Sequence, residues 1–197
     1  SNQPRIVISG ALVRMGNKPS LSFSGQNTTF LQFPTQLSLL SYSSSIVLQS
    51  PSGSALSGGL FLGNETFSNY DFLGSSASGH LEVSRNTLQN NQKVSAVSNL
   101  GKGVVLSSHF ETSGKGSGHV DMLRVGTFTF SPQVLNAQQG SIGNPLAPWQ
   151  GLISECFLFE NPLDYMEANL SEASQYDYFS IGKKTYIPKY LEDKSTV

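Results

Sequence analysis

Hydrophobic and polar residues alternate in short runs along most of the chain. The runs are rich in β-branched and aromatic residues, and Gly, Asn, Ser and Pro separate them. Alternation with such punctuation predicts β-strands. We expect strands at residues 5–13, 20–23, 29–33, 45–48, 60–62, 80–84, 93–98, 103–111, 119–125, 127–130 and 151–160. Many short strands with almost no helix between them predict an all-β protein, an antiparallel sandwich or barrel.

Two of these strands differ in their expected surroundings. The strand at residues 103–111 has an apolar face and a mixed face, so we expect it to be half buried and half exposed. Its apolar face carries Val104, Leu106 and Phe110, and its mixed face carries Val105, Ser107 and His109. The strand at residues 152–159 is apolar on both faces, which predicts a place deep inside the fold.

Glu155 interrupts that apolar strand, on the face of Ile153. A carboxylate in such a place needs a hydrogen-bond or charge partner. We expect a structural hydrogen-bonding group, with a catalytic acid or metal ligand as the alternative.

One segment, residues 163–176, has helical spacing. Its apolar stripe consists of Leu163, Met166, Leu170 and Ala173, and Pro162 suits the start of a helix. We therefore expect a sandwich over residues 1–180 that includes one short C-terminal helix. An extension over residues 181–197 should dock on it through Tyr186, Ile187 and Tyr190, while the last residues fray.

Composition narrows the function classes. A hydrophobic fraction of 38% and a net charge of -1 favour a globular chain over a disordered one, with a solvent face of Ser, Thr, Asn and Gln. The near-zero charge gives no footprint for nucleic acid. No apolar run approaches the roughly 20 residues of a membrane span. Cys156 is the one cysteine, so an internal disulfide is excluded, and its apolar surroundings predict a buried thiol.

Two stretches near the ends of the chain resemble a known family. Residues 16–25 read Gly-Asn-Lys-Pro-Ser-Leu-Ser-Phe-Ser-Gly, after Gln-Pro-Arg-Ile-Val at residues 3–7. Residues 149–159 read Trp-Gln-Gly-Leu-Ile-Ser-Glu-Cys-Phe-Leu-Phe, before Asn-Pro-Leu and the predicted helix. Both resemble segments of concanavalin A-like (laminin G-like) lectin/glucanase domains. The resemblance implies a jelly-roll sandwich of two antiparallel sheets, and further strands upstream in a longer chain.

The residues do not match the catalytic patterns of this family or of others. The resemblance implies that a glucanase would carry a Glu-x-Asp-x-Glu cluster, which is absent, and Glu155 and Glu160 have opposite strand parity. None of the three histidines, His80, His109 and His119, accompanies a nucleophile elbow, and we expect them to be surface or strand histidines. The Gly-rich residues 114–118 lack P-loop spacing and predict a flexible hairpin loop. We expect no enzyme.

Candidate ligand-binding residues lie in two predicted loops. For a glycan they are Tyr70, Asp71, Asn144 and Trp149, which combine aromatic rings with amide and carboxylate groups. Packing at the start of the buried strand is the other interpretation of Trp149, and the favoured one. Calcium is the metal that the resemblance implies, and Asn64, Glu65, Asn69 and Asp71 are its candidate ligands. A polar turn without any cofactor is the favoured reading of that loop.

Together these observations predict a non-catalytic module of a virion or cell-surface protein that serves attachment or structural assembly. It would belong to a larger chain or assembly, with a homo-oligomer possible, and its partner would be a glycan or a surface protein. The alternative is a carbohydrate-binding lectin module, with or without calcium, and a glycoside hydrolase is less favoured. The expected location is extracellular, on a cell surface or in a virion.

Overall fold

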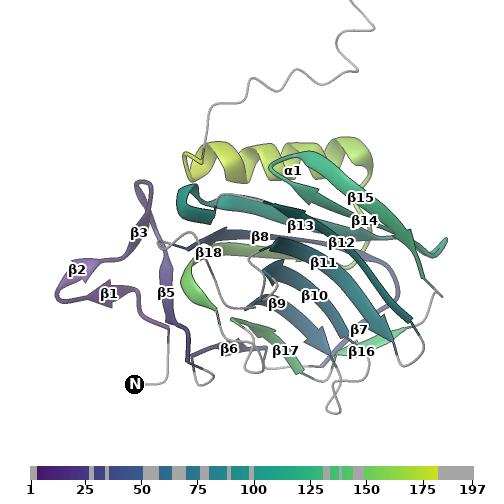
Figure 1. Cartoon of the computed structure of the whole chain (residues 1–197), viewed down its shortest axis with the longest axis horizontal. Coiled ribbons are helices and arrows are strands. Elements are labelled where there is room, and N and C mark those ends of the chain that lie inside the picture. Colours follow the sequence, from purple (N-terminus) through teal and green to yellow (C-terminus); the bar gives the residue numbers. More distant parts are fainter. Residues whose placement is uncertain are drawn as a thin grey trace, which may run out of the picture.

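The computed structural model describes residues 4–26, 29–33, 36–50, 58–63, 70–75, 80–87, 90–97, 100–130, 134–137, 139–143 and 149–181. In these residues two six-stranded antiparallel sheets face each other, and one helix, α1 (Tyr165–Tyr178), lies on the outer side of one sheet (Figure 1). This confirms the predicted two-sheet sandwich with a C-terminal helix. Among the described residues, no helix has the length and apolar character needed to cross a membrane.

The two main sheets differ in where their strands come from in the sequence. Sheet I, which α1 covers, has the order β15 (Leu123–Thr129), β14 (Lys115–Val120), β13 (Val104–Phe110), β8 (Tyr42–Gln49), β18 (Gln150–Phe159), β5 (Leu21–Ser24). Sheet II has the order β12 (Asn90–Val97), β11 (His80–Thr87), β10 (Tyr70–Ser75), β9 (Gly58–Gly63), β17 (Gln139–Ile142), β6 (Leu31–Gln32). Sheet II is thus built around a meander, whereas sheet I joins strands from both ends of the chain.

Smaller elements complete the described chain. Three two-stranded pairs are β1 (Val7–Ile8) with β2 (Ala11–Leu12), β3 (Arg14–Met15) with β4 (Lys18–Pro19), and β7 (Leu37–Leu39) with β16 (Leu135–Ala137). A short 3-10 turn spans Leu100–Lys102.

The apolar core lies between the two sheets. Its fully buried side chains include Phe23, Tyr42, Ile46, Leu48, Leu60, Leu62, Leu73, Leu81, Leu106, Phe110 and Trp149. The ring of Phe110 meets those of Phe128 and Phe130 edge-on, with centroids 5.8 and 5.7 Å away. Burial of these side chains is the main force that holds the sheets together.

Turns divide some predicted strands differently from the sequence expectation. Residues 5–13 form a hairpin, because Ser9 and Gly10 turn the chain with φ of 50° and 78°. The Gly-rich residues 114–118 were predicted to be a loop, but most of them belong to β14. The turn comes earlier, where the Glu111 amide donates to the Lys115 carbonyl at 2.9 Å. The next turn, at Asp121 and Met122, splits the strand that was predicted at residues 119–125.

Strand β10 was not predicted, and residues 70–71 were placed in a loop. Tyr70 and Asp71 are instead the first residues of β10, paired with Gly63 and Leu62 of β9. Gly74 and Ser75 give the segment little strand propensity of its own, so pairing on both sides determines its conformation. The sequence pattern also did not predict β7, β16 and β17, because these strands are too short to show an alternating run.

The helix was predicted in the right place, but it faces the opposite way. Asp164 caps it, since its side chain accepts from the Glu167 amide at 2.8 Å and the Glu167 carboxylate accepts from the Asp164 amide at 3.0 Å. The predicted apolar stripe faces solvent at Met166 and Leu170, which are 45% and 53% exposed. The buried residues of α1 are Ala168, Asn169, Glu172, Gln175 and Tyr176.

The outer face of sheet I explains this reversal. Strand β13 is buried along its whole length, which corrects the half-exposed strand expected from its sequence. Ser107 and His109 lie under α1 rather than in water, so the helix places polar residues against a polar sheet face.

Glu155 lies on that same outer face. A bulge between Ile153 and Glu155 of β18 changes the strand parity, so Glu155 is opposite Val47 rather than on the face of Ile153. Its carboxylate accepts a hydrogen bond from Gln175 Nε2 of α1 at 3.1 Å, as expected for a structural group. The residues of β18 after the bulge are half-buried and not deep in the core, which corrects that expectation.

The proposed C-terminal extension lies outside the described residues, apart from its first residue. Ile181 packs against a second apolar cluster that includes Met15, Val47, Val105 and Phe179. Its amide donates to the Tyr176 carbonyl at 3.1 Å, so the chain leaves α1 in contact with the sandwich.

The reversed helix face gives a direct prediction. Leu170→Lys should change the free energy of unfolding by less than about 0.5 kcal/mol, because the side chain already faces water. Ala168→Lys should destabilise the fold by about 2 kcal/mol or more, because Ala168 is 2% exposed. Urea unfolding monitored by circular dichroism measures both values, and equal losses in the two variants would contradict the orientation of α1.

Cys156 should be unreactive in the folded chain. Cys156 as a whole is half-buried. Desolvation of its thiol, and secondarily the charge of Glu155, raises the pKa of Cys156 to about 12, so little thiolate exists at about pH 8. Iodoacetamide should alkylate it slowly in native buffer and quickly in concentrated guanidinium, as followed by intact-mass spectrometry. Equal rates in the two solvents would show that the thiol is accessible.

Candidate functional site

A buried cluster of ionisable side chains lies between sheet I and α1. It consists of His109 on β13, His119 on β14 and Glu172 on α1, and we call it the His–Glu cluster. Glu172 Oε1 is 3.1 Å from His119 Nδ1 and 3.5 Å from His109 Nε2. The three residues are 9%, 3% and 1% exposed, so two imidazoles flank one carboxylate out of contact with bulk water.

The register of one hairpin brings the histidines together. In the pairing of β13 with β14, His109 lies opposite Ser117 and His119 lies opposite Ser107. Side chains two apart on a strand share a face, so all four project from the same side of sheet I. The imidazole centroids are 4.7 Å apart. Because α1 crosses this side of the sheet, Glu172 comes down between them.

Serine hydroxyls surround the cluster. Ser107 donates to Glu172 Oε1 at 2.5 Å. Ser43 Oγ lies 2.7 Å from His109 Nδ1 and also accepts from the Leu163 amide at 2.9 Å. Ser117 Oγ lies 3.5 Å from His119 Nε2. Each imidazole therefore has one nitrogen toward Glu172 and the other toward a serine.

The cluster holds Glu172 as a carboxylate. Burial alone raises the pKa of Glu172, but the neighbouring imidazoles of His109 and His119 and the Ser107 hydroxyl outweigh burial and lower it to about 2. Two buried atoms of the cluster, His109 Nε2 and Glu172 Oε2, have no hydrogen-bond partner in the described structure. Buried polar atoms are rarely left in this state.

The order Ser117, His119, Glu172 is that of a nucleophile, a base and an orienting acid. The geometry does not suit acyl transfer. Ser117 Oγ and His119 Nε2 are 3.5 Å apart, too far for a strong hydrogen bond, and His119 and Glu172 are buried under α1, where a substrate cannot reach them. The cluster is better suited to holding a buried cation than to reaching a substrate.

Two of the predicted ligand-binding residues lie in the interior. Asp71 is 3% exposed and accepts a hydrogen bond from the hydroxyl of Tyr42 between the sheets. Trp149 is 0% exposed, and its Nε1 donates to the Leu152 carbonyl at 3.3 Å. Neither side chain offers surface to a ligand, and Trp149 has the packing position that was its other interpretation.

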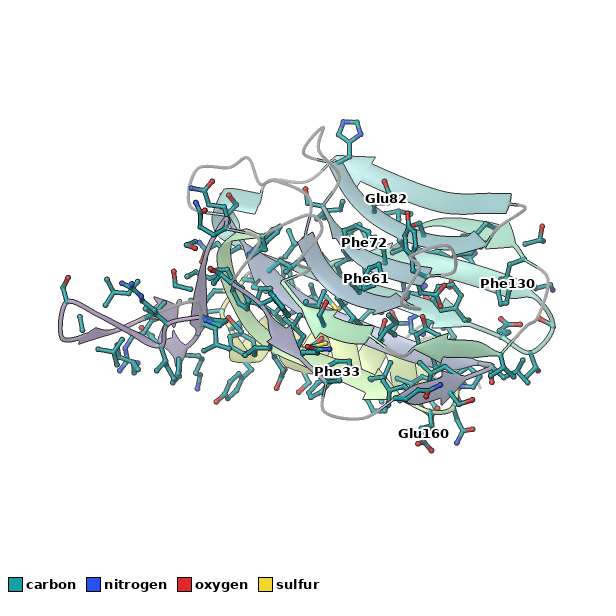
Figure 2. All side chains as sticks on the ribbon, turned by 90° about the horizontal axis from the view of Figure 1, so that it is seen from below. Phe33, Phe61, Phe72, Glu82, Phe130 and Glu160 are labelled. Carbon is teal, nitrogen blue, oxygen red and sulfur yellow. The ribbon has the colours of Figure 1, made fainter. Side chains whose placement is uncertain are left out.

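Tyr70 lies on the outer face of sheet II. It is half-buried, and its ring centroid is 5.3 Å from that of Phe61. The Phe61 ring lies over Gly63, where a Cβ atom would come within 2.4 Å of it. Phe72 is paired with Phe61 on the neighbouring strand, and Figure 2 shows Glu82 beyond them on β11. We call the outer-face group of Phe61, Tyr70, Phe72, Glu82 and Ser84 the Tyr70 face. Tyr70 and Glu82 are its half-buried members, and the other three are buried.

The remaining predicted ligands, Asn64, Glu65, Asn69 and Asn144, lie outside the described residues. The calcium loop thus stays a prediction, although Asp71, one of its four candidate ligands, faces the sandwich interior.

Sequence reasoning missed the His–Glu cluster. His80 is exposed, as expected for a surface histidine, but His109 and His119 are buried together. The position of the hairpin turn could have revealed it. A turn at residues 111–114 pairs β13 with β14 so that His109 and His119 lie on the same face, whereas the predicted loop at residues 114–118 does not define which residues pair.

Comparisons with known proteins find similarity in structure only. No protein-family model matches the chain, and no curated protein does. Domain 4 of AbnA, an extracellular arabinanase from Geobacillus stearothermophilus in complex with arabinotriose, superposes with a TM-score of 0.66, 15% identity, and coverage of 84% of this chain and 78% of that one. The SAP-like pentraxin of Limulus polyphemus superposes with a TM-score of 0.60 at 14% identity, and the match covers 76% of this chain and 79% of that one.

A third neighbour is the CBM40 of the Ruminococcus gnavus IT-sialidase bound to α2,3-sialyllactose. Its TM-score is 0.55 at 15% identity, and the match covers 68% of this chain and 83% of that one. At such identities the likeness concerns the fold. These neighbours are concanavalin A-like jelly-roll domains, and this chain has the same fold, as its two ends predicted.

Proposed function

We propose that the chain is a carbohydrate-binding module and that the Tyr70 face is its glycan site. The observation that carries the proposal is the half-buried ring of Tyr70 next to Phe61 on the outer face of sheet II, on the opposite side of the sandwich from α1. An aromatic ring provides a platform for the apolar face of a sugar, while nearby polar groups bond its hydroxyls. Glu82, which is half-buried, supplies such a group on the same face.

The structural neighbours support a binding role. Two of them were solved with oligosaccharides, arabinotriose in one and α2,3-sialyllactose in the other. The neighbours are mostly non-catalytic domains, although the fold also occurs in glycosidases.

The three carboxylates that described strands carry favour binding over hydrolysis. Asp71 lies between the sheets, Glu82 is on the outer face of sheet II, and Glu155 is under α1. No two of these three share a face of the sandwich, so they do not form the facing pair that glycoside hydrolysis requires. We propose an extracellular location, in line with the extracellular arabinanase among the neighbours.

Replacing Tyr70 should weaken glycan binding without unfolding the chain. We expect Tyr70→Ala to weaken the binding of an oligosaccharide, first identified on a glycan array that includes arabinotriose and sialyllactose, by about ten-fold or more. Isothermal titration calorimetry in EDTA and in excess calcium measures the affinity and any metal requirement.

Tyr165→Ala provides the matched control, because Tyr165 is a 66% exposed tyrosine on α1, on the other side of the sandwich. Its affinity should equal that of the parent chain. If the array shows no binding in either buffer, or if both variants lose affinity alike, the Tyr70 face is not a glycan site.

A second candidate function is attachment or structural assembly, as in a cell-surface or virion protein. The β1–β2 hairpin projects from one side of the sandwich (Figure 1). Four apolar side chains at residues 6–12 are exposed. They are Ile6, Val7, Ile8 and Leu12, each 38–49% exposed. Clustered exposed apolar residues mark interaction surfaces, and here we propose a second copy of this chain as the occupant.

Solution mass tests the assembly function. Light scattering should give a mass above one chain at high protein concentration, and Ile8→Asp should return it to that of one chain, because a buried charge opposes association. Leu123→Asp, at a 65% exposed leucine of β15, is the control and should leave the mass unchanged. A single-chain mass for the parent protein at all concentrations would contradict this function.

A further inference from the structure

We propose that His109, His119 and Glu172 bind a zinc ion that ties α1 to sheet I. The three ligands come from three elements, β13, β14 and α1, and each is nine-tenths buried or more. Such a site is independent of glycan binding, since the Tyr70 face lies on the outer side of sheet II.

The spacing of the ligand atoms suits a tetrahedral ion. With metal–ligand distances of about 2.0–2.1 Å, two ligands of a tetrahedral zinc ion lie roughly 3.3 Å apart. The Glu172 oxygen is 3.1 Å from His119 Nδ1 and 3.5 Å from His109 Nε2, and all three ligand atoms lie within 4.8 Å of one another. Small side-chain movements therefore suffice to coordinate one ion.

The ligand types favour zinc over calcium. Two imidazole nitrogens and one carboxylate oxygen form a set that zinc prefers, whereas calcium requires six to eight oxygens. Three protein ligands leave one position, which the second carboxylate oxygen of Glu172 or a water molecule fills.

The serines around the cluster have the roles of supporting groups in metal sites. A metal-binding histidine almost always donates its other N–H to a fixed acceptor, which orients the ring. Here His109 Nδ1 faces Ser43 Oγ at 2.7 Å and His119 Nε2 faces Ser117 Oγ at 3.5 Å. The Ser107 hydroxyl in turn fixes the Glu172 carboxylate.

The unpartnered atoms point to a missing ligand. His109 Nε2 and Glu172 Oε2 have less than 1 Å² of exposed area each and no hydrogen-bond partner. They belong to the two residues between which the ion would lie, so coordination gives His109 Nε2 a partner, and bidentate binding by Glu172 gives its Oε2 one as well. A purely hydrogen-bonded cluster leaves both unsatisfied.

Metal content tests the site directly. The purified chain should carry close to one zinc per molecule by inductively coupled plasma mass spectrometry, and a strong chelator should remove it. Adding zinc back at about 100 times its Kd should raise the melting temperature by roughly 5–10 °C. Cobalt in place of zinc should give the intense visible bands of a tetrahedral site with nitrogen and oxygen ligands.

Variants locate the ion. His119→Asn and Glu172→Gln should each lose the bound zinc and the thermal shift, with circular dichroism used to check that they fold. His80→Asn, at the exposed histidine of β11, is the control and should keep both. If a variant fails to fold, the cobalt spectrum of the parent chain decides.

Three results would overturn the proposal: a folded parent chain that neither retains zinc nor melts at a higher temperature with it, a cobalt spectrum typical of octahedral coordination, or full zinc content in folded Glu172→Gln. None of these bears on glycan binding, which is tested at Tyr70.

Discussion

The polar contact between α1 and sheet I determines how the molecule is organised. The central strands of sheet I, β8 and β13, are buried on both sides, and the outer face of the sheet is less apolar than the inner one, with Val47 and Val105 beside polar side chains. Its outer face is closed by directed hydrogen bonds: Ser45 donates to Gln175, Gln175 donates to Glu155, and Ser107 donates to Glu172. Hydrophobic contacts tolerate sliding, whereas a network of this kind has one satisfied arrangement. The helix therefore has a fixed position, and its apolar side chains are left for solvent.

Many of the serines in this chain are buried inside sheet I rather than exposed on its surface. The sequence suggests that serine builds the solvent face, yet Ser43, Ser44, Ser45, Ser107 and Ser108 are all buried. They lie in register across β8 and β13, and Ser44 and Ser108 hydrogen-bond to each other at 2.6 Å between the strands. A small hydroxyl suits the centre of a sheet where a neighbouring strand or helix supplies its partner, and such partners cannot be seen in a local pattern.

The sequence predicted those elements whose conformation follows from the residues of the segment itself. The β-branched run of β8, the closing strand β18 and the capped start of α1 each carry their own signal, and the two family-like ends predicted the jelly roll. Residues 70–75 and 115–120 have Gly and Ser where strand formers would be expected, and only pairing makes them strands. The cluster of His109, His119 and Glu172 depends on the register of one hairpin and on the rotation of one helix, so it could not be predicted. Tyr70 was identified by residue type, although its place on a strand was not.

The position of β18 has a consequence for synthesis. This strand, at residues 150–159, lies between β8 and β5, whose residues precede it by about a hundred positions or more. Until it emerges from the ribosome, β8 has an unpaired edge of eight residues, and α1, which follows it in the chain, cannot yet cover the outer face of sheet I. Sheet I can therefore close only when nearly all of the described chain has been made, and a nascent chain that pauses before residue 150 would expose an edge strand suited to pairing with a neighbouring chain. Folding of such non-local strand pairs is slow, because the long loop must be closed before the contacts form.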